Sequence, residues 1–301
     1  MADLLPPLCQ YCGATRPSCG EDPCAPILWT LSALFTATWL VALAAAAAAA
    51  TTPPAALPAG RMWRWAVGGS GALLALSACA AALASILPVA DAAVLAPDAW
   101  FMVLLAVAVP LTRAAAALLL MPVWLALYAE ATASGARAAN AARSLVALLL
   151  AALALAALVL AAHAWAGDAR DITALAPYSL AADALISVAG VMWLVHAVPR
   201  VISLPSFAGV VSKDMNLLRT TSRRIAVYTA LACLAVVIEA VRYALDHLRS
   251  STDRDHRAER NGVFVALAAT TSLLRWLVLV ATTATVVSFV RHAMARAARL
   301  E

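Results

Sequence analysis

The sequence carries little charge. Only 12% of its 301 residues are Asp, Glu, Lys or Arg, whereas 64% are hydrophobic and the mean hydropathy is +0.89. Soluble domains contain about 25% charged and about 45–50% apolar residues. A soluble core of this size could not bury the excess apolar surface. The composition therefore excludes an ordinary cytosolic enzyme, a disordered chain and a nucleic-acid-binding domain, and it predicts a polytopic membrane protein in a lipid bilayer.

The sequence also lacks the short motifs that carry chemistry. It contains no glycine-rich phosphate loop, no H-E-x-x-H zinc motif and no G-x-S-x-G nucleophile motif. Lys213 is the single lysine and lies outside the apolar stretches, so the seventh stretch has no lysine to bind retinal, as an opsin requires. We therefore expect no enzyme activity, no cofactor and no metal.

Long apolar stretches are the main feature that is present. Each reaches the roughly 20 residues that a spanning helix needs, and short alternating strands are not seen. Alanine supplies many of these apolar residues, so a biased amino-acid composition is an alternative explanation for part of the first stretch. The sequence predicts an all-α bundle of seven transmembrane helices. The seven stretches cover residues 27–50, 64–88, 100–128, 141–164, 179–203, 222–246 and 263–290.

The distribution of basic residues predicts the orientation, because Lys and Arg gather in cytoplasmic loops. The gaps after the first, third and fifth spans are basic, and so is the C-terminal tail. We expect an outer or lumenal N-terminal segment over 1–26, a membrane domain over 27–295 and a cytosolic tail over 296–301. The gap 248–262 is expected to be a mobile outer loop of mixed charge. Tryptophans agree with these depths: Trp29, Trp100 and Trp165 fall at outer ends, and Trp63, Trp65 and Trp124 fall at inner ends.

Four of the six cysteines crowd the N-terminal segment: Cys9, Cys12, Cys19 and Cys24. The first pair has the C-x-x-C spacing of zinc ribbons and redox sites, but the second pair does not, and no histidine lies nearby. An outer or lumenal location favours two disulfides over a zinc site. The sequence does not give the pairing.

Ionisable residues inside the predicted spans are the candidates for a functional site. Such residues are costly in a bilayer and usually face the interior of a bundle. We expect a polar cluster in the outer half of the bundle that serves ligand binding or proton relay. The alternative is that the charges pair only to fix helix register. The candidates are Arg113, Asp183, Glu239, Arg242 and Arg275.

Three short segments resemble a known family. The run Trp124-Leu-Ala-Leu-Tyr-Ala-Glu130, followed by Arg137, resembles the end of the third span in the tobamovirus multiplication protein family. Val198-Pro-Arg200 and Ser288-Phe-Val-Arg291 look like that family's exits from the fifth and seventh spans. The seventh stretch lacks the acidic residue and the Leu-Pro-Ser of the family, and the cysteine-rich N-terminus is a second departure.

The resemblance implies a seven-span membrane scaffold, similar also to animal lysosomal orphan-receptor-like proteins, in a vacuolar or lysosomal membrane. The plasma membrane is the other expected location. Such a protein would recruit cytosolic partners through the basic loop 200–224, whose charge attracts acidic segments or anionic lipids. The alternative is that this charge only sets topology. The candidate contact residues are Glu130, Arg137, Arg200, Lys213, Arg219, Arg223 and Arg224.

Three functions therefore remain open at this point. The first is the non-enzymatic receptor-like or scaffold protein that the resemblance implies. The second is a small-solute or ion transporter or channel, in which the intramembrane charges line a polar path. The third is a structural subunit of a larger membrane complex, which would show a broad apolar bundle without a ligand.

Overall fold

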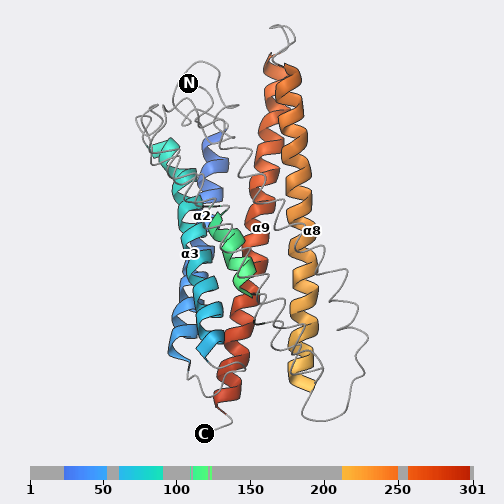
Figure 1. Ribbon diagram of the computed structural model, residues 1–301. Helices are drawn as coiled ribbons and strands as arrows, with labels where there is room; N and C mark the ends of the chain where they lie inside the picture. The colour runs from blue at the N-terminus through green and yellow to red at the C-terminus, as the bar shows by residue number, and fades with distance from the viewer. Residues whose placement is uncertain are drawn as a thin grey trace, which may run out of the picture.

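The computed structural model describes residues 24–52, 61–90, 109, 111–120, 123, 212–249 and 257–298. Within these ranges every regular element is a helix (Figure 1). Four helices are long and apolar enough to cross a membrane, and a shorter apolar helix covers Leu111–Leu120. The prediction of an all-helical integral membrane protein is confirmed to this extent. The four long helices are α2 (Cys24–Thr51), α3 (Arg61–Ala90), α8 (Ser212–Arg249) and α9 (Arg257–Ala297).

These helices match the first, second, sixth and seventh predicted spans. The short helix 111–120 lies within the third predicted span, 100–128. The fourth and fifth predicted spans, 141–164 and 179–203, lie outside the described residues.

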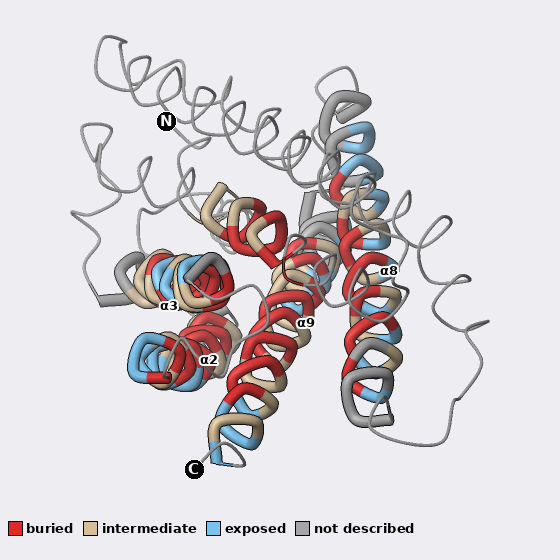
Figure 2. The backbone as a smooth tube through the Cα atoms, turned by 60° about the horizontal axis from the view of Figure 1, so that its bottom comes forward, coloured by how far each residue is buried: buried red, intermediate tan, exposed pale blue. Residues whose placement is uncertain are grey.

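Helix α9 occupies the centre of the described bundle. It packs against α2 and α3 on one side and against α8 on the other (Figure 2). Its buried side chains include Val286, Phe289, Val290 and Ala293, all 3% exposed or less. Trp276 fixes α9 to α2, because its indole N–H donates hydrogen bonds to the Leu34 carbonyl and the Thr38 hydroxyl.

Helices α2 and α3 form a close antiparallel pair built on small residues. A Cβ atom placed on Gly71 of α3 would lie 3.1 Å from both the Cα and the Cβ of Ala46 on α2. The alanines that α2 buries, Ala42, Ala45 and Ala49, are spaced along one helical face. The alanine-rich end of α2 therefore serves as a packing surface, since small side chains let two backbones approach closely in a membrane.

Two predicted loops are partly wrong. The loop expected over 248–262 is shorter, because α8 continues to Arg249 and α9 begins at Arg257. The loop expected over 200–224 is helical from Ser212 onward. At about 1.5 Å per residue, the 38 residues of α8 and the 41 of α9 give lengths of about 57 and about 62 Å. A hydrocarbon core is about 30 Å thick, so both helices continue into polar surroundings.

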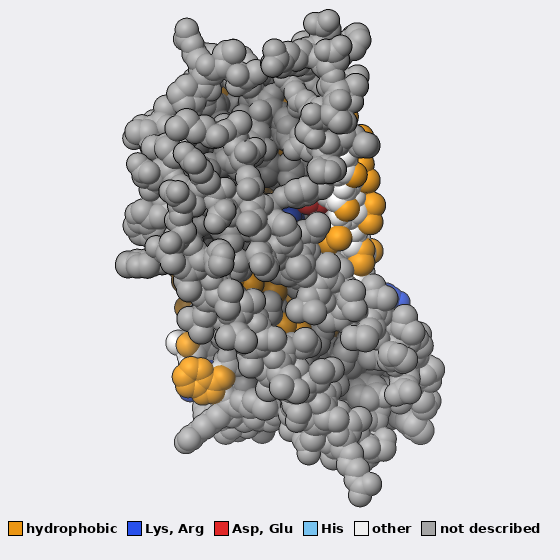
Figure 3. Space-filling model, turned by 45° about the horizontal axis from the view of Figure 1, so that its top comes forward, with side chains coloured by type: hydrophobic (Ala, Val, Ile, Leu, Met, Phe, Trp, Pro, Cys, Tyr) orange, Lys and Arg blue, Asp and Glu red, His pale blue; other side chains and the backbone are white. Residues whose placement is uncertain are grey.

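Large apolar side chains on the outside of the bundle are consistent with contact to lipid. On α8 they form one stripe along the helix, and Figure 3 shows exposed apolar side chains in orange on the surface. Soluble proteins seldom expose a continuous apolar surface of this kind. The stripe on α8 consists of Val227, Leu234, Val237, Val241 and Leu245, each 40–57% exposed.

Candidate functional site

Three of the five predicted intramembrane charges have described side chains. Arg113 and Glu239 are buried, at 5% and 7% exposure, and Arg275 is half-buried. Asp183 lies outside the described residues, and the side chain of Arg242 on α8 is not described.

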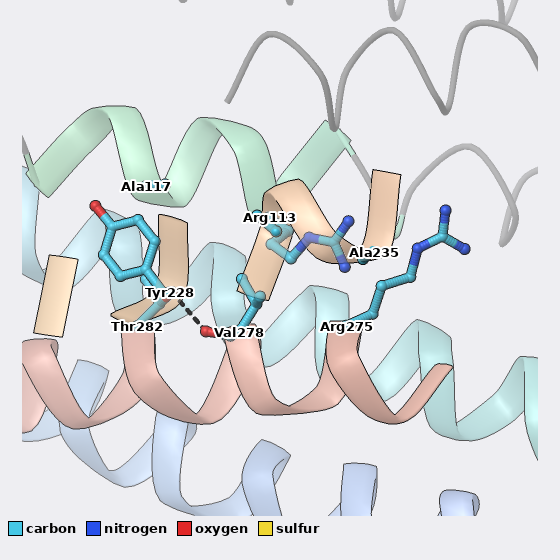
Figure 4. Close-up of a pocket in the computed structure, with 8 residues that line it drawn as sticks. Arg113, Ala117, Tyr228, Ala235, Arg275, Val278 and Thr282 are labelled. Atoms are coloured by element: carbon cyan, nitrogen blue, oxygen red, sulfur yellow. Dashed lines mark hydrogen bonds between the residues drawn. The ribbon is translucent and has the colours of Figure 1, made fainter. Parts of the chain in front are cut away.

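Two of these charged residues line one pocket (Figure 4). Arg113 reaches it from the short helix 111–120 and Arg275 from α9, although the two residues are far apart in sequence. The remaining wall is mostly apolar, and the free volume at the centre is about 10 Å³, room for about one water molecule. The other lining residues are Ala117 of the short helix, Tyr228, Ala232 and Ala235 of α8, and Val278 and Thr282 of α9.

The register between α8 and α9 shows how the pocket is built. Arg224 of α8 donates a hydrogen bond of 2.8 Å to the Ala284 carbonyl of α9 and a second, short one to the Ser288 hydroxyl. Since the helices run antiparallel, counting along both from this contact places Ala235 level with Arg275. The lining residues of the two helices follow this register, so the pocket is a continuation of the α8–α9 interface.

Glu239 lies one helical turn beyond the pocket on the same face of α8 as Ala235. The same register places it level with Thr271, four residues before Arg275 on α9. In Figure 4 the guanidinium group of Arg113 reaches toward Ala235 and that of Arg275 extends past it, both away from Tyr228 and Thr282. Both cationic groups are therefore directed toward the level at which α8 carries its buried carboxylate.

Two exposed tryptophans give the expected position of the bilayer. Trp29 on α2 is 56% exposed and Trp65 on α3 is 80% exposed, as expected for side chains at a membrane–water interface. The contact of Gly71 with Ala46 sets the α2–α3 register and places Trp65 level with Thr52. Trp29 and Trp65 are thus separated by about 35 Å along the helix axis, close to the thickness of a bilayer. Trp63, which was expected at the same interface, is instead 3% exposed and packs in the core.

The charged site lies near one of these two boundaries. The Trp276 contacts with Leu34 and Thr38 align α9 with α2. This alignment places Arg275 about 9 Å, and Glu239 about 3 Å, further into the bilayer than Trp29. The site is therefore closer to the Trp29 boundary than to the Trp65 boundary. The sequence predicted a polar cluster in the outer half of the bundle, and this stays a prediction because it depends on the orientation of the chain.

Hydrogen bonds to α3 hold the short helix that carries Arg113. Ser70 donates to the Ala116 carbonyl at 2.8 Å, and Ser77 donates to the Val109 carbonyl at 3.0 Å. Serines commonly join transmembrane helices in this way. They fix both ends of the segment that positions the guanidinium.

The sequence analysis did not identify the uncharged residues of the pocket. The helical spacing of three of them relative to Glu239 could have indicated them. Tyr228, Ala232 and Ala235 precede Glu239 at spacings of eleven, seven and four residues, which is the pattern of one helical face. The contribution of Ala117 needed the packing of the short helix, which no local pattern reveals.

The predicted partner-binding residues divide into three groups. Glu130, Arg137 and Arg200 lie outside the described residues, and the side chain of Lys213 is not described. Arg223 is exposed and Arg219 is half-buried. Arg224 turns into the bundle to bond α9, so it is not a surface residue of a loop.

The four cysteines of the predicted disulfides have no described side chains. Cys9, Cys12 and Cys19 lie outside the described residues, and Cys24 begins α2 with its side chain not described. Cys79 and Cys233 have free thiols and are half-buried. Within the described ranges, no group of three or more His, Cys, Asp or Glu side chains is placed to hold a metal ion.

Comparison with known proteins supplies no family for the chain. No family model, no curated protein and no solved structure matches it. The resemblance to the tobamovirus multiplication proteins therefore stays a prediction. The fold and the pocket are the basis on which a function can be argued.

Proposed function

We propose that the chain is a membrane carrier for a small negatively charged solute, which binds between Arg113 and Arg275. The observation that carries the proposal is that two arginines, from separate helices, line one pocket within the apolar part of the bundle. We further propose seven spans with the N-terminus outside and the C-terminus in the cytosol, as the positive charges of the alternate gaps predict.

The energetic argument concerns the cost of these charges. A single ionised side chain at the centre of a spanning helix costs about 2.5–3.5 kcal/mol on insertion scales, and Arg275, about 9 Å inside the Trp29 boundary, carries a smaller part of that cost. Two like charges on one pocket repel each other in addition. A solute that carries negative charge would meet positive charge from two helices at this pocket, and this supports the proposal.

Flux measured in vesicles tests this proposal. The full chain is reconstituted into liposomes, and movement of chloride, acetate and phosphate is followed under an imposed membrane potential. We expect at least one of these anions to cross faster than in protein-free liposomes. Arg275→Gln should reduce the rate about tenfold or more, because it removes one of the two cations that bind the solute.

Arg291→Gln is the matched control for that variant. It makes the same change on the same helix, but Arg291 is exposed and lies outside the pocket. It should leave the flux unchanged. Equal rates in protein-containing and protein-free liposomes for all three anions would overturn the carrier proposal.

The receptor-like or scaffold function remains a second proposal, with recruitment of cytosolic partners at a vacuolar, lysosomal or plasma membrane. It is supported by the exposed position of Arg223 at the polar start of α8. Arg223→Gln separates the two proposals, because Arg223 does not line the pocket and the change should leave anion flux intact. Loss of partner recruitment in that variant, in a chain that carries no anion, would favour the scaffold.

A further inference from the structure

We propose that the outer face of α8 binds one anionic phospholipid, with the lipid phosphate at Arg223 and an acyl chain along the apolar stripe that follows. The proposal concerns the surface of the bundle and goes beyond the carrier function. It makes no use of the pocket, so it holds whether or not the chain carries a solute. Its basis is an exposed cation at the end of an exposed apolar stripe.

Arg223 continues the apolar stripe of α8 toward the Trp65 boundary. The exposed residues Arg223, Val227 and Leu234 are spaced by four and seven residues, about one and two helical turns, and so lie on one helical face. Figure 2 shows exposed positions of α8 on the side turned away from α9. The neighbouring Arg224 bonds α9 instead. Arg223 is therefore the cation that the outer face of α8 presents where the stripe ends.

The helix registers give the depth of this cation. Counting along the helices from the hydrogen bonds that join α8, α9 and α2 puts Arg223 level with Ala47 of α2, whereas Trp65 is level with Thr52. The backbone of Arg223 is thus about 7.5 Å further into the bilayer than that of Trp65. Helical side chains lean toward the helix N-terminus, which for α8 is the Trp65 end. A long arginine side chain at this depth reaches the headgroup layer while its methylene groups contact acyl chains.

A phospholipid fits both parts of this surface. A guanidinium group can form two parallel hydrogen bonds with a phosphate, and an acyl chain covers exposed valine and leucine side chains. Arg224 adds positive charge one residue away, since it is hydrogen-bonded to the neutral Ala284 carbonyl and Ser288 hydroxyl. This charge favours an anionic lipid over a zwitterionic one, whose own ammonium group offsets its phosphate. An acidic protein segment would pair with the arginine but would leave the apolar stripe uncovered.

Lipid retention by the purified full chain tests the proposal. Native mass spectrometry in a neutral detergent compares phosphatidylglycerol with phosphatidylcholine of the same acyl chains. The wild-type chain should bind phosphatidylglycerol about fivefold more tightly, the preference expected from one basic residue at an anionic lipid surface. Arg223→Gln should abolish this preference. Arg223→Lys should keep part of it, because lysine retains the charge but lacks the paired N–H groups of the guanidinium.

Arg291→Gln is the matched control for Arg223→Gln. Arg291 is also exposed and lies near the Trp65 boundary, but the residues about one and two turns before it on α9, Val287 and Ala284, are half-buried. Arg291 therefore does not end an exposed apolar stripe, and its removal should leave the preference for phosphatidylglycerol unchanged.

The other outcomes overturn the proposal. Equal retention of the two lipids by the wild-type chain does so without any variant, and a preference that survives in Arg223→Gln places the anionic lipid elsewhere. Competition by glycerol 3-phosphate as effective as that by the whole lipid shows that the stripe contributes nothing and assigns the site to a soluble phosphate. Binding of a poly-glutamate peptide that Arg223→Gln abolishes, together with equal retention of the two lipids, assigns the arginine to a protein partner.

Discussion

The two antiparallel helix pairs in this molecule are held together in different ways. Between α2 and α3, small residues bring the backbones into contact, and a buried Ser32 hydroxyl that donates to the Ala82 carbonyl at 3.3 Å adds a polar link. Between α8 and α9, the contact includes an arginine hydrogen-bonded to the opposite helix and a mostly apolar pocket that Arg275 helps to line. The first pair is a close-packed frame, and the second leaves space between its side chains.

The difference shows how a membrane protein can use one helix pair for stability and another for ligand binding. Lipid is as apolar as leucine, so helices gain little from burying apolar side chains against each other and depend on packing and hydrogen bonds. Close packing gives the most contact but leaves no room for a ligand. A pair that hosts a ligand must be joined by polar contacts elsewhere, and Arg224 supplies such a contact about two helical turns from the pocket centre.

The largest effect should come from filling the contact between α2 and α3. Gly71→Val places a branched side chain where even a Cβ atom meets the Ala46 backbone, at 3.1 Å from its Cα atom. We expect a loss of about 3 kcal/mol in the free energy of unfolding, the upper end for overpacked sites, because backbone cannot yield as a flexible side chain does. Reversible unfolding in mixed micelles measures this loss.

Ala72→Val is the control for Gly71→Val, since Ala72 is the next residue along α3 and is exposed. It should change the free energy of unfolding by about 0.5 kcal/mol or less. Equal losses in the two variants would show that the close contact is not what stabilises the frame.

A smaller effect is expected at the polar link between α8 and α9. Arg224→Gln removes the hydrogen bonds to Ala284 and Ser288 and should cost about 1–2 kcal/mol in the free energy of unfolding. The neighbouring Arg223 is exposed, so Arg223→Gln should have almost no effect on this measurement. If Arg224→Gln were as harmless as Arg223→Gln, polar contacts would not be what joins this pair.

The sequence predicted the apolar cores of the described spans well, because their hydropathy is a local property. It failed at the ends of α8 and α9, where the chain stays helical beyond the apolar stretch. Residues such as Lys213 and Arg257 look like loop residues to a hydropathy pattern, but a long helix can continue into polar surroundings. Hydropathy marks where the bilayer is, and it does not mark where the helix stops.

The candidate site was predictable to a similar degree. Arg113, Glu239 and Arg275 were identified because charge in an apolar stretch is conspicuous. That Arg113 and Arg275 line the same pocket was not predictable, since it depends on the packing of the short helix against α3 and on the register of α8 with α9. Both are set by individual hydrogen bonds, such as that of Arg224, which composition does not reveal.

The smallest effect should come from the serine contact that connects the frame to the site. Ser70→Ala removes the hydrogen bond from α3 to the Ala116 carbonyl, and such contacts between membrane helices are worth about 0.6 kcal/mol on average. Ser85 is a matched control, because its hydroxyl is also buried but donates to the Ala81 carbonyl of its own helix. Ser70→Ala should therefore destabilise the protein slightly more than Ser85→Ala. It should also lower anion flux about twofold, since the short helix holds Arg113 against the pocket, whereas Ser85→Ala leaves that helix in place. Equal anion flux in the two variants would show that the frame does not position the site, and that the two helix pairs act independently.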